Sequence, residues 1–360
     1  MKRIKTSAPA RICLFGEHQD YMGNSVIAAA IDLRINIEGN IFNGNEINIL
    51  LKDYEKKIHF KTDNIVYSNN KDYLKSSVKV LIEKGLFNGK TIDAEVFSNI
   101  PVKAGISSSS AYTVCWIAFL LESEEKFKNF DNKREEIGEL AYISEVVEFN
   151  ESGGRMDQYT IAIGDTVYIN FKEPIITKKL NTVLKNFVLG DSLQPKNTQK
   201  TLKRIREGQT EAYKELRKHI KFNSHNELNS DIIKPYLNKI DVKLRNYLYA
   251  AVRNFDITEE AAKEMSKLHP DEERLVDLMN EHHSILRDKL NLSTEKINKM
   301  IENSFKAGAK AAKISGSGEG GCMFAYCPGK QEEVYEEILK AGGKPYIINI
   351  GKGVEVEEIT

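Results

Sequence analysis

Four consecutive serines, Ser107 to Ser110, follow a glycine and lead into an apolar stretch. A helix starting there would offer unpaired backbone N–H groups and the positive end of its dipole, an arrangement that binds phosphate, most obviously a triphosphate. The candidate anion-binding residues are Lys103, Ala104, Gly105, Ile106, Ser107, Ser108, Ser109, Ser110 and Ala111. The alternative is a serine-capped core helix, because serine is a favoured capping residue. This segment alone does not decide between the two.

A second polar cluster, Glu17, His18 and Asp20, follows a short strand-like segment that ends in Gly16. Recognition of a polyol requires several directional donors and acceptors close together. Taken alone, the cluster fits a polar loop with incidental charges better than a binding site. It becomes a candidate substrate site only together with the other segments.

A possible catalytic carboxylate, Asp157, follows the glycine pair Gly153 and Gly154. A carboxylate there could accept a proton from an attacking hydroxyl group. Glu145, on the preceding helical stretch, has the oxygen atoms that divalent cations prefer as ligands. The alternatives are a helix-capping role for Asp157 and a solvated surface position for Glu145.

A third glycine loop lies near the C-terminus, where Gly316, Gly318 and Gly321 have the spacing of a dinucleotide-binding turn. That turn must open a helix, whereas a strand-like run follows here, so we reject a dinucleotide site. Two interpretations remain: a glycine-rich hairpin, or a loop, including Gly320, that packs against phosphate or substrate. The Walker A motif and the protein kinase motifs His-Arg-Asp and Asp-Phe-Gly are absent, which excludes both of those classes.

Composition bounds the class of protein. The 360 residues include 52 basic and 52 acidic side chains, and this balance gives no support for nucleic acid or a membrane as the main partner. No apolar run approaches the roughly 20 residues that span a bilayer, and the basic start lacks the apolar core of a signal peptide. The four cysteines are scattered. We expect a cytoplasmic protein without disulfides or structural zinc; its oligomeric state stays open.

The elements that must position these segments alternate between strands and helices. Strand character is found at 11–15, 31–37, 46–51, 94–97, 165–171 and 187–190, and helical character at 71–84, 111–123 and 133–150. Residues 198–307 are helix-rich, two strands flank the third glycine loop, and a helix and a strand follow. The fold class is therefore α/β (α+β). The length favours two lobes around a cleft, and we place their boundary near Pro174, giving domains 1–174 and 175–360.

Taken together and in order, these segments resemble the GHMP kinase superfamily and, within it, the galactokinases. Residues 11–21 (Arg-Ile-Cys-Leu-Phe-Gly-Glu-His-Gln-Asp-Tyr) are similar to the galactokinase opening motif, and residues 156–158 (Met-Asp-Gln) to its catalytic motif. The serine segment resembles the family's ATP loop, and residues 316–322 resemble its third motif. Residues 281–288 (Glu-His-His-Ser-Ile-Leu-Arg-Asp) resemble a further galactokinase segment.

The resemblance implies an N-terminal lobe of ribosomal-S5-like type, a ferredoxin-like C-terminal lobe, and ATP and a sugar bound between them. It implies transfer of the γ-phosphoryl group of ATP to the anomeric hydroxyl of a sugar such as galactose. By the same resemblance, Asp157 is the catalytic carboxylate, Arg11 steadies the transferring group, Ser109 and Glu145 hold Mg²⁺, and Glu17, His18, Asp20 and Gly154 contact sugar hydroxyls.

Several positions depart from the galactokinase pattern. Arg155 stands where galactokinases carry Ile, which suggests an acceptor with a carboxylate, such as galacturonate; a solvent-facing arginine is the alternative. Residues 111–115 and 196–198 are closer to mevalonate kinases, but those lack an acidic residue at the position of Asp20, which a polyol acceptor explains. The alternatives to a sugar kinase are a GHMP kinase acting on mevalonate, a heptose or a uronic acid, and a non-catalytic relative that senses ATP and sugar.

Overall fold

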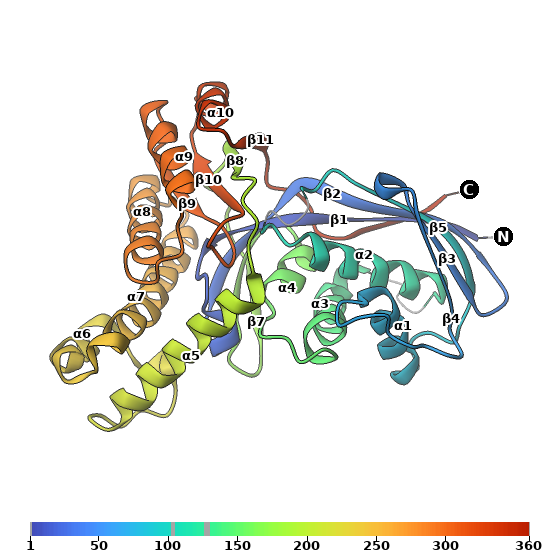
Figure 1. Ribbon diagram of the computed structural model, residues 1–360, viewed down its shortest axis with the longest axis horizontal. Helices are drawn as coiled ribbons and strands as arrows, with labels where there is room; N and C mark the ends of the chain where they lie inside the picture. Colours follow the sequence, from blue (N-terminus) through green and yellow to red (C-terminus); the bar gives the residue numbers. More distant parts are fainter. Residues whose placement is uncertain (1, 102–104, 126–129, 360) are drawn as a thin grey trace.

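The computed structural model describes residues 2–101, 105–125 and 130–359, so Lys103 and Ala104 of the predicted phosphate loop lie outside the described residues. The described chain forms two β-sheets, with helices packed against both: a large sheet that runs to the two chain termini at the right of Figure 1, and a smaller one at the upper left. This arrangement confirms the predicted mixed α/β class.

The larger sheet is built on two long antiparallel strands, β1 (Lys2–Phe15) and β2 (Val26–Phe42). Burial along β1 alternates at first and becomes continuous from Ala8 onward, as expected where both faces of a strand become covered. The sheet has the order β12–β1–β2–β5–β3–β4, with β6 on β2 and β7 on β6. The remaining strands are β3 (Glu46–Leu51), β4 (Lys56–Lys61), β5 (Thr91–Ser98), β6 (Thr166–Asn170), β7 (Ile176–Lys179) and β12 (Glu355–Ile359).

Helix α2 (Ser108–Ser123) lies between this sheet and a layer of helices, α1 (Tyr73–Glu83), α3 (Arg134–Tyr142) and α4 (Met156–Ile163) (Figure 1). Because α2 has protein on both sides, it is apolar around most of its circumference, and Trp116 and Phe119 are fully buried. The sheet therefore holds the serine-rich start of α2 in a fixed place.

The second half contains a four-stranded antiparallel sheet of order β11–β8–β10–β9. Its strands are β8 (Phe187–Asp191), β9 (Ala311–Ile314), β10 (Cys322–Tyr326) and β11 (Lys344–Ile348). The helices are α5 (Thr198–Arg217), α6 (Ser230–Ile233), α7 (Val242–Met265), α8 (Glu272–Asp288), α9 (Glu295–Lys306) and α10 (Gln331–Lys340). Two later strands, β7 and β12, join the first sheet, so the boundary near Pro174 stays a prediction.

Three predicted elements differ clearly in extent from the observed ones. The strands expected at 11–15 and 31–37 are parts of the much longer β1 and β2. The helix expected over 133–150 is interrupted: α3 ends at Tyr142, and a π-helical turn follows over Ile143–Val147. Such turns are frequent at functional sites, and this one carries Glu145.

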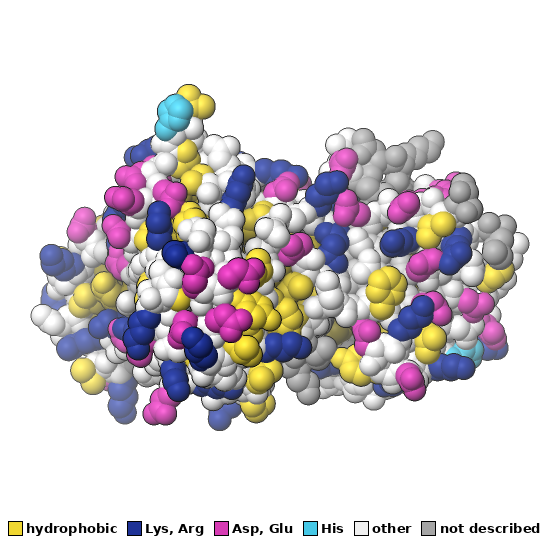
Figure 2. All heavy atoms as spheres, turned by 90° about the horizontal axis from the view of Figure 1, so that it is seen from above, with side chains coloured by type: hydrophobic (Ala, Val, Ile, Leu, Met, Phe, Trp, Pro, Cys, Tyr) yellow, Lys and Arg dark blue, Asp and Glu magenta, His cyan; other side chains and the backbone are white. Residues whose placement is uncertain are grey.

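The surface seen from above shows basic and acidic side chains intermingled, with hydrophobic side chains gathered only in small groups (Figure 2). This view agrees with the balanced charge of the chain. Among the described residues, no helix is long and apolar enough to cross a membrane.

Candidate active site

A cavity of about 750 Å³ collects most of the residues predicted from the sequence. Those that line it are Arg11, Glu17, His18, Asp20, Gly105, Ser107, Ser108, Ser109, Ser110, Glu145, Gly154, Asp157 and Gly316. Of the other described candidates, Ile106 and Ala111 are buried in the core beside it. Gly318 packs against Leu292, and Gly320 against the backbone of residues 194–195. Segments from both halves of the chain thus meet around one space.

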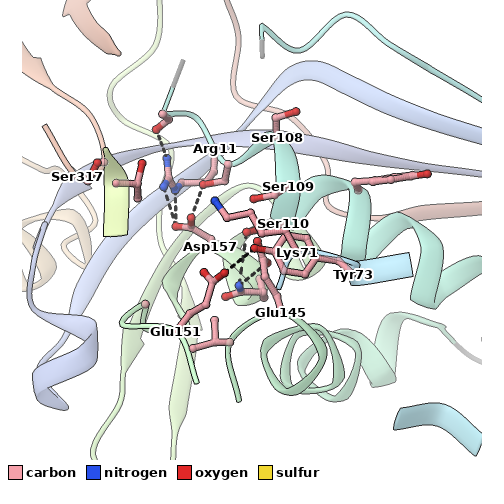
Figure 3. A pocket seen from close by; sticks show the side chains of 18 of the residues that line it. Arg11, Lys71, Tyr73, Ser108, Ser109, Ser110, Glu145, Glu151, Asp157 and Ser317 are labelled. Atoms are coloured by element: carbon pink, nitrogen blue, oxygen red, sulfur yellow. Dashed lines mark hydrogen bonds and ion pairs between the residues drawn. The ribbon is translucent and has the colours of Figure 1, made fainter. Parts of the chain in front are cut away.

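The Asp157 carboxylate is fixed at the centre of this cavity (Figure 3). It lies in the first turn of α4 and faces Arg11, whose side chain is 4% exposed on β1. Two guanidinium nitrogens of Arg11 lie 2.7 Å from Asp157 Oδ1, and a third contact runs from Arg11 Nη1 to the Gly105 carbonyl oxygen at 3.1 Å. Ser107 Oγ donates a hydrogen bond to Asp157 Oδ2. One oxygen of the carboxylate is therefore held by a cation and the other by a hydroxyl group.

The start of α2 supplies a possible anion site. Ser107 precedes the helix with a left-handed backbone (φ 64°), and its side chain makes no capping hydrogen bond. Its hydroxyl group turns to Asp157 instead, so the serine-cap interpretation does not describe this helix. Ser108, Ser109 and Ser110 line the cavity around the first turn (Figure 3), where the positive end of the dipole favours an anion.

Glu145 meets this site from the π-helical turn. Its side chain is buried, and Gln158 Nε2 donates a hydrogen bond of 2.7 Å to Oε2. Burial raises the pKa of Glu145 to about 7, against the opposing effect of hydrogen bonds from Ser109, Gln158 and Ser110. Carboxylate and hydroxyl oxygens are the donors that Mg²⁺ prefers, so this set fits that ion. Among the described residues no group of three or more His, Cys, Asp or Glu side chains could hold a metal ion, so further ligands would have to come from substrate phosphates or water.

The turn over residues 17–20 forms the opposite wall. Asp20 Oδ2 accepts a hydrogen bond from the Met156 backbone N–H at 3.2 Å. Burial, with a smaller contribution from the Asp157 charge, raises the pKa of Asp20 to about 6. A Cβ atom added to Gly154 would lie 2.0 Å from Asp20 Oδ2, so only glycine allows this approach.

The other two candidate residues of the turn, His18 and Glu17, differ in their surroundings. His18 contacts the Tyr21 hydroxyl at 2.9 Å and the Ser317 carbonyl oxygen at 3.2 Å, and burial lowers the pKa of His18 to about 4, which keeps its ring neutral. The Glu17 carboxylate forms a buried ion pair with Lys313. A direct contact between Glu17 and substrate stays a prediction.

The Arg155 side chain does not point into the cavity, which corrects the suggestion that it binds a substrate carboxylate. Its Nε atom lies 3.2 Å from Glu139 Oε2, and its guanidinium group stacks 4.5 Å from the centre of the Tyr142 ring. It is absent from the described residues that line the cavity. The helical periodicity that places Asp157 inward turns Arg155, two residues earlier, to the other side.

Sequence reasoning missed several lining residues. Lys196 donates a hydrogen bond to Ser317 Oγ at 3.1 Å, and burial together with the Arg11 charge lowers the pKa of Lys196 to about 8. Glu151 accepts hydrogen bonds from Tyr73, at 2.8 Å, and from Gln199. Only Lys196 had a signal, in the mevalonate-kinase-like segment 196–198. The others come together only through the fold.

Comparison with known proteins gives three family matches. The model described as "GHMP kinases N terminal domain" matches residues 72–165, and "GHMP kinases C terminal" matches residues 259–344. The "Galactokinase galactose-binding signature" matches residues 2–40. These ranges contain the serine loop, Asp157 and the 17–20 turn.

The individual relatives include both mevalonate kinases and galactokinases. A mevalonate kinase from Thermococcus gammatolerans is 31% identical, with 99% of each chain covered. A galactokinase from Clostridium perfringens is 28% identical, with 96% of this chain and 90% of the relative covered. The crystal structure of Lactococcus lactis galactokinase complexed with galactose superposes with a TM-score of 0.86 at 20% identity, covering 98% of this chain and 95% of that one. The Methanococcus jannaschii mevalonate kinase gives a TM-score of 0.70 at 20% identity, covering 97% and 98%. These structural matches speak for the fold alone.

Proposed function

Since the chain belongs to the GHMP kinase family and is therefore a phosphotransferase, we propose that it transfers the γ-phosphoryl group of ATP to the anomeric hydroxyl of a sugar, most simply galactose. The observation that carries this proposal is the Asp157 carboxylate, fixed by Arg11 and Ser107 between the start of α2 and the 17–20 turn. Asp20 and the galactose-binding signature over residues 2–40 support a polyol as the acceptor.

On the nucleotide side, the triphosphate would lie on the first turn of α2, where the serines and backbone N–H groups surround it. The apolar part of the cavity, lined by Leu51, Val96, Ile100 and Tyr112, would receive the base. Ser109 and Glu145 would hold Mg²⁺, which neutralises phosphate charge when bound.

On the acceptor side, Asp157 would orient the reacting hydroxyl group. As the oxygen–phosphorus bond forms and the bond to ADP breaks, the hydroxyl proton passes to the Asp157 carboxylate. Arg11 would offset the negative charge that gathers on the phosphoryl oxygens. Asp20 and His18 would bind the other hydroxyl groups of the sugar, which fixes the angle of attack.

A second candidate function is a kinase for an alcohol that carries a carboxylate, such as mevalonate. The observation that favours it is Lys196, which lines the cavity without an ion pair to any acidic side chain among the described residues. Such a cation would pair with an acidic acceptor. The mevalonate kinases at about 30% identity support the same candidate.

An ADP-release panel with galactose, galacturonate, a heptose and mevalonate tests the two candidates. A sugar kinase should prefer galactose, and Asp20→Asn should lower its kcat/KM by about 10- to 100-fold, as expected for the loss of about 1–3 kcal/mol of buried hydrogen bonding. Lys196→Met should then change galactose turnover much less than Asp20→Asn does. Turnover of mevalonate above galactose, abolished by Lys196→Met, would overturn the sugar proposal in favour of the acid.

A further inference from the structure

Three consecutive side chains of the 17–20 turn are held by the second half of the chain, although the turn itself leaves the first sheet. Glu17 pairs with Lys313 on β9, and His18 Nε2 contacts the Ser317 carbonyl oxygen at 3.2 Å. Gln19 Nε2 donates to the Ala251 carbonyl oxygen of α7 at 3.1 Å. Contacts with the second half of the chain therefore fix the position of the next residue, Asp20.

Lys313 has the strongest of these attachments. Its side chain is fully buried, and its Nζ atom both pairs with Glu17 and donates to the Cys13 carbonyl oxygen of β1 at 2.9 Å. His282 on α8 is also fully buried, with Nε2 3.6 Å from Glu17 Oε2. Within this apolar surrounding the ammonium group has two fixed oxygen partners, both next to or within the turn.

A second contact fixes the same end of β1. The Cys13 backbone N–H donates to Ser315 Oγ at 3.3 Å. The segment 313–317 therefore binds the chain on both sides of Gly16, through Cys13 before it and through Glu17 and His18 after it. The third glycine loop begins inside this segment. The residues at the end of β9, just before that loop, therefore hold the 17–20 turn in place.

A buried ion pair adds little net stability compared with apolar side chains of similar volume, because both charges lose their hydration. Its hydrogen-bonded geometry is nevertheless directional, and losing one partner leaves the other charge buried. These properties suit a group that fixes a position.

We propose that Lys313 is a positioning residue, which through Glu17 and the Cys13 carbonyl sets the distance between Asp20 and Asp157 and thereby the placement of the acceptor. The proposal rests on the proposed function only in taking the 17–20 turn as the acceptor side. It assigns Lys313 no contact with the reacting atoms.

Kinetics of Lys313→Met test this role, with galactose and mevalonate as acceptors. We expect KM for the acceptor that wild type phosphorylates to rise by about 10- to 100-fold, a size typical of misplaced substrate groups, while KM for ATP changes by less than about twofold. Lys313→Arg, which keeps the charge, should recover part of the loss. Lys310→Met is the matched control, because Lys310 lies three residues earlier, directly before β9, in an exposed ion pair with Glu272, and it should alter neither constant.

If Lys313→Met does not fold, the double variant Glu17→Gln with Lys313→Met decides, because it leaves no unpaired buried charge. It should fold and show the same rise in acceptor KM, and a smaller rise in Glu17→Gln alone separates the position of the turn from any direct contact of Glu17 with the acceptor. Equal rises in both KM values, or none in a folded variant, would overturn the proposal and leave the pair as a simple link between the two halves.

Hydrogen exchange gives a measurement that needs no acceptor. The backbone N–H groups of Met22, Gly23 and Asn24 bond to Gln19 and Asp20 carbonyl oxygens within the turn. In the variant without Lys313 they should exchange faster, while α2 keeps its wild-type rate. Unchanged exchange in the turn would contradict the proposal. Failure of wild type to phosphorylate any acceptor would instead count against the proposed function, and this measurement would still stand.

Discussion

The two walls of the cavity are built in different ways. The wall at the start of α2 comes from one continuous stretch, in which Gly105, the serines and the apolar helix follow one another. The opposite wall, the 17–20 turn, depends on partners far away in the sequence: Lys313 lies 296 residues from Glu17, and Ala251 lies 232 residues from Gln19.

This difference bears on how one fold can serve several acceptors. The backbone N–H groups of a helix start that can bind phosphate come from one local stretch of chain, although the sheet and Arg11 fix where that stretch lies. A turn positioned by α7, α8 and β9 moves whenever those elements move. Under the proposed function, changes in these elements of the second half would alter the acceptor side first, and the relatives named both mevalonate kinase and galactokinase agree with this.

The largest effect should come from the residue that both walls share. Asp157→Asn keeps the size of the side chain but removes the group that accepts a proton, so kcat should fall by about 10²- to 10⁴-fold. KM for ATP should change little, because Asp157 does not form the start of α2. Steady-state ADP release on a variant with wild-type circular dichroism checks this. A folded variant with near-normal kcat would remove Asp157 from the catalytic role.

The glycine pair before α4 allows a test confined to the wall that the 17–20 turn forms. A Cβ atom at Gly154 would meet Asp20 at 2.0 Å, whereas one at Gly153 would lie 3.6 Å from Val146, an ordinary contact. Gly154→Ala should therefore displace Asp20 and raise acceptor KM by about 10- to 100-fold. Gly153→Ala is the control and should stay within about twofold. Similar behaviour of the two variants would contradict the close approach of Asp20 and Gly154.

The same difference explains what sequence reasoning could predict. A helix after the serine segment was predicted, because glycine, serine and an apolar run are local signals for a helix terminus; α2 starts at Ser108, earlier than the predicted residue 111. The mixed α/β class followed from the alternation of element types. The motif order was enough to bring Arg11, Asp157 and Glu145 into one hypothesis, and the cavity contains all three.

What the sequence did not reveal depends on side-chain direction and on distant partners. Helical periodicity predicts that Arg155 and Asp157 face different sides, but which of the two faces the cavity depends on how α4 is rotated against α3, which no local pattern encodes. The burial of the Glu17 carboxylate against Lys313 is a contact between the 17–20 turn and β9. The π-helical turn that carries Glu145 was hidden within an unbroken helical pattern.

A pH titration of stability distinguishes the two buried carboxyl groups Glu145 and Asp20. Folding raises the pKa of Glu145 from 4.5 to about 7 and that of Asp20 from 3.8 to about 6. The folded state therefore binds more protons than the unfolded state, and the stability that each group contributes is lost as pH rises through its folded pKa. Between pH 6 and 8 the contribution of Glu145 falls by about 1.4 kcal/mol, whereas the contribution of buried His18, whose pKa is lowered from 6.5 to about 4, rises over the same range.

Denaturant unfolding without ligands measures this loss. The difference in unfolding free energy between wild type and Glu145→Gln should fall by about 1.4 kcal/mol from pH 6 to pH 8, whereas the difference between wild type and Asp20→Asn should change mainly below pH 6. A difference between wild type and Glu145→Gln that stays constant over the upper range would contradict the raised pKa of Glu145.

The smallest effect is expected at Arg155, which is next to Gly154 in sequence but belongs to neither wall. Its ion pair with Glu139 is partly exposed, with side chains 28% and 34% accessible, and such pairs contribute about 0–1 kcal/mol to stability. Arg155→Ile should change kcat/KM for galactose and for galacturonate by less than about twofold, because its guanidinium group points to Tyr142 and away from the cavity. A selective loss of galacturonate turnover would show that Arg155 reaches the acceptor after all. Acceptor choice would then depend on a residue beside Asp157 as well as on the distant contacts that position the 17–20 turn.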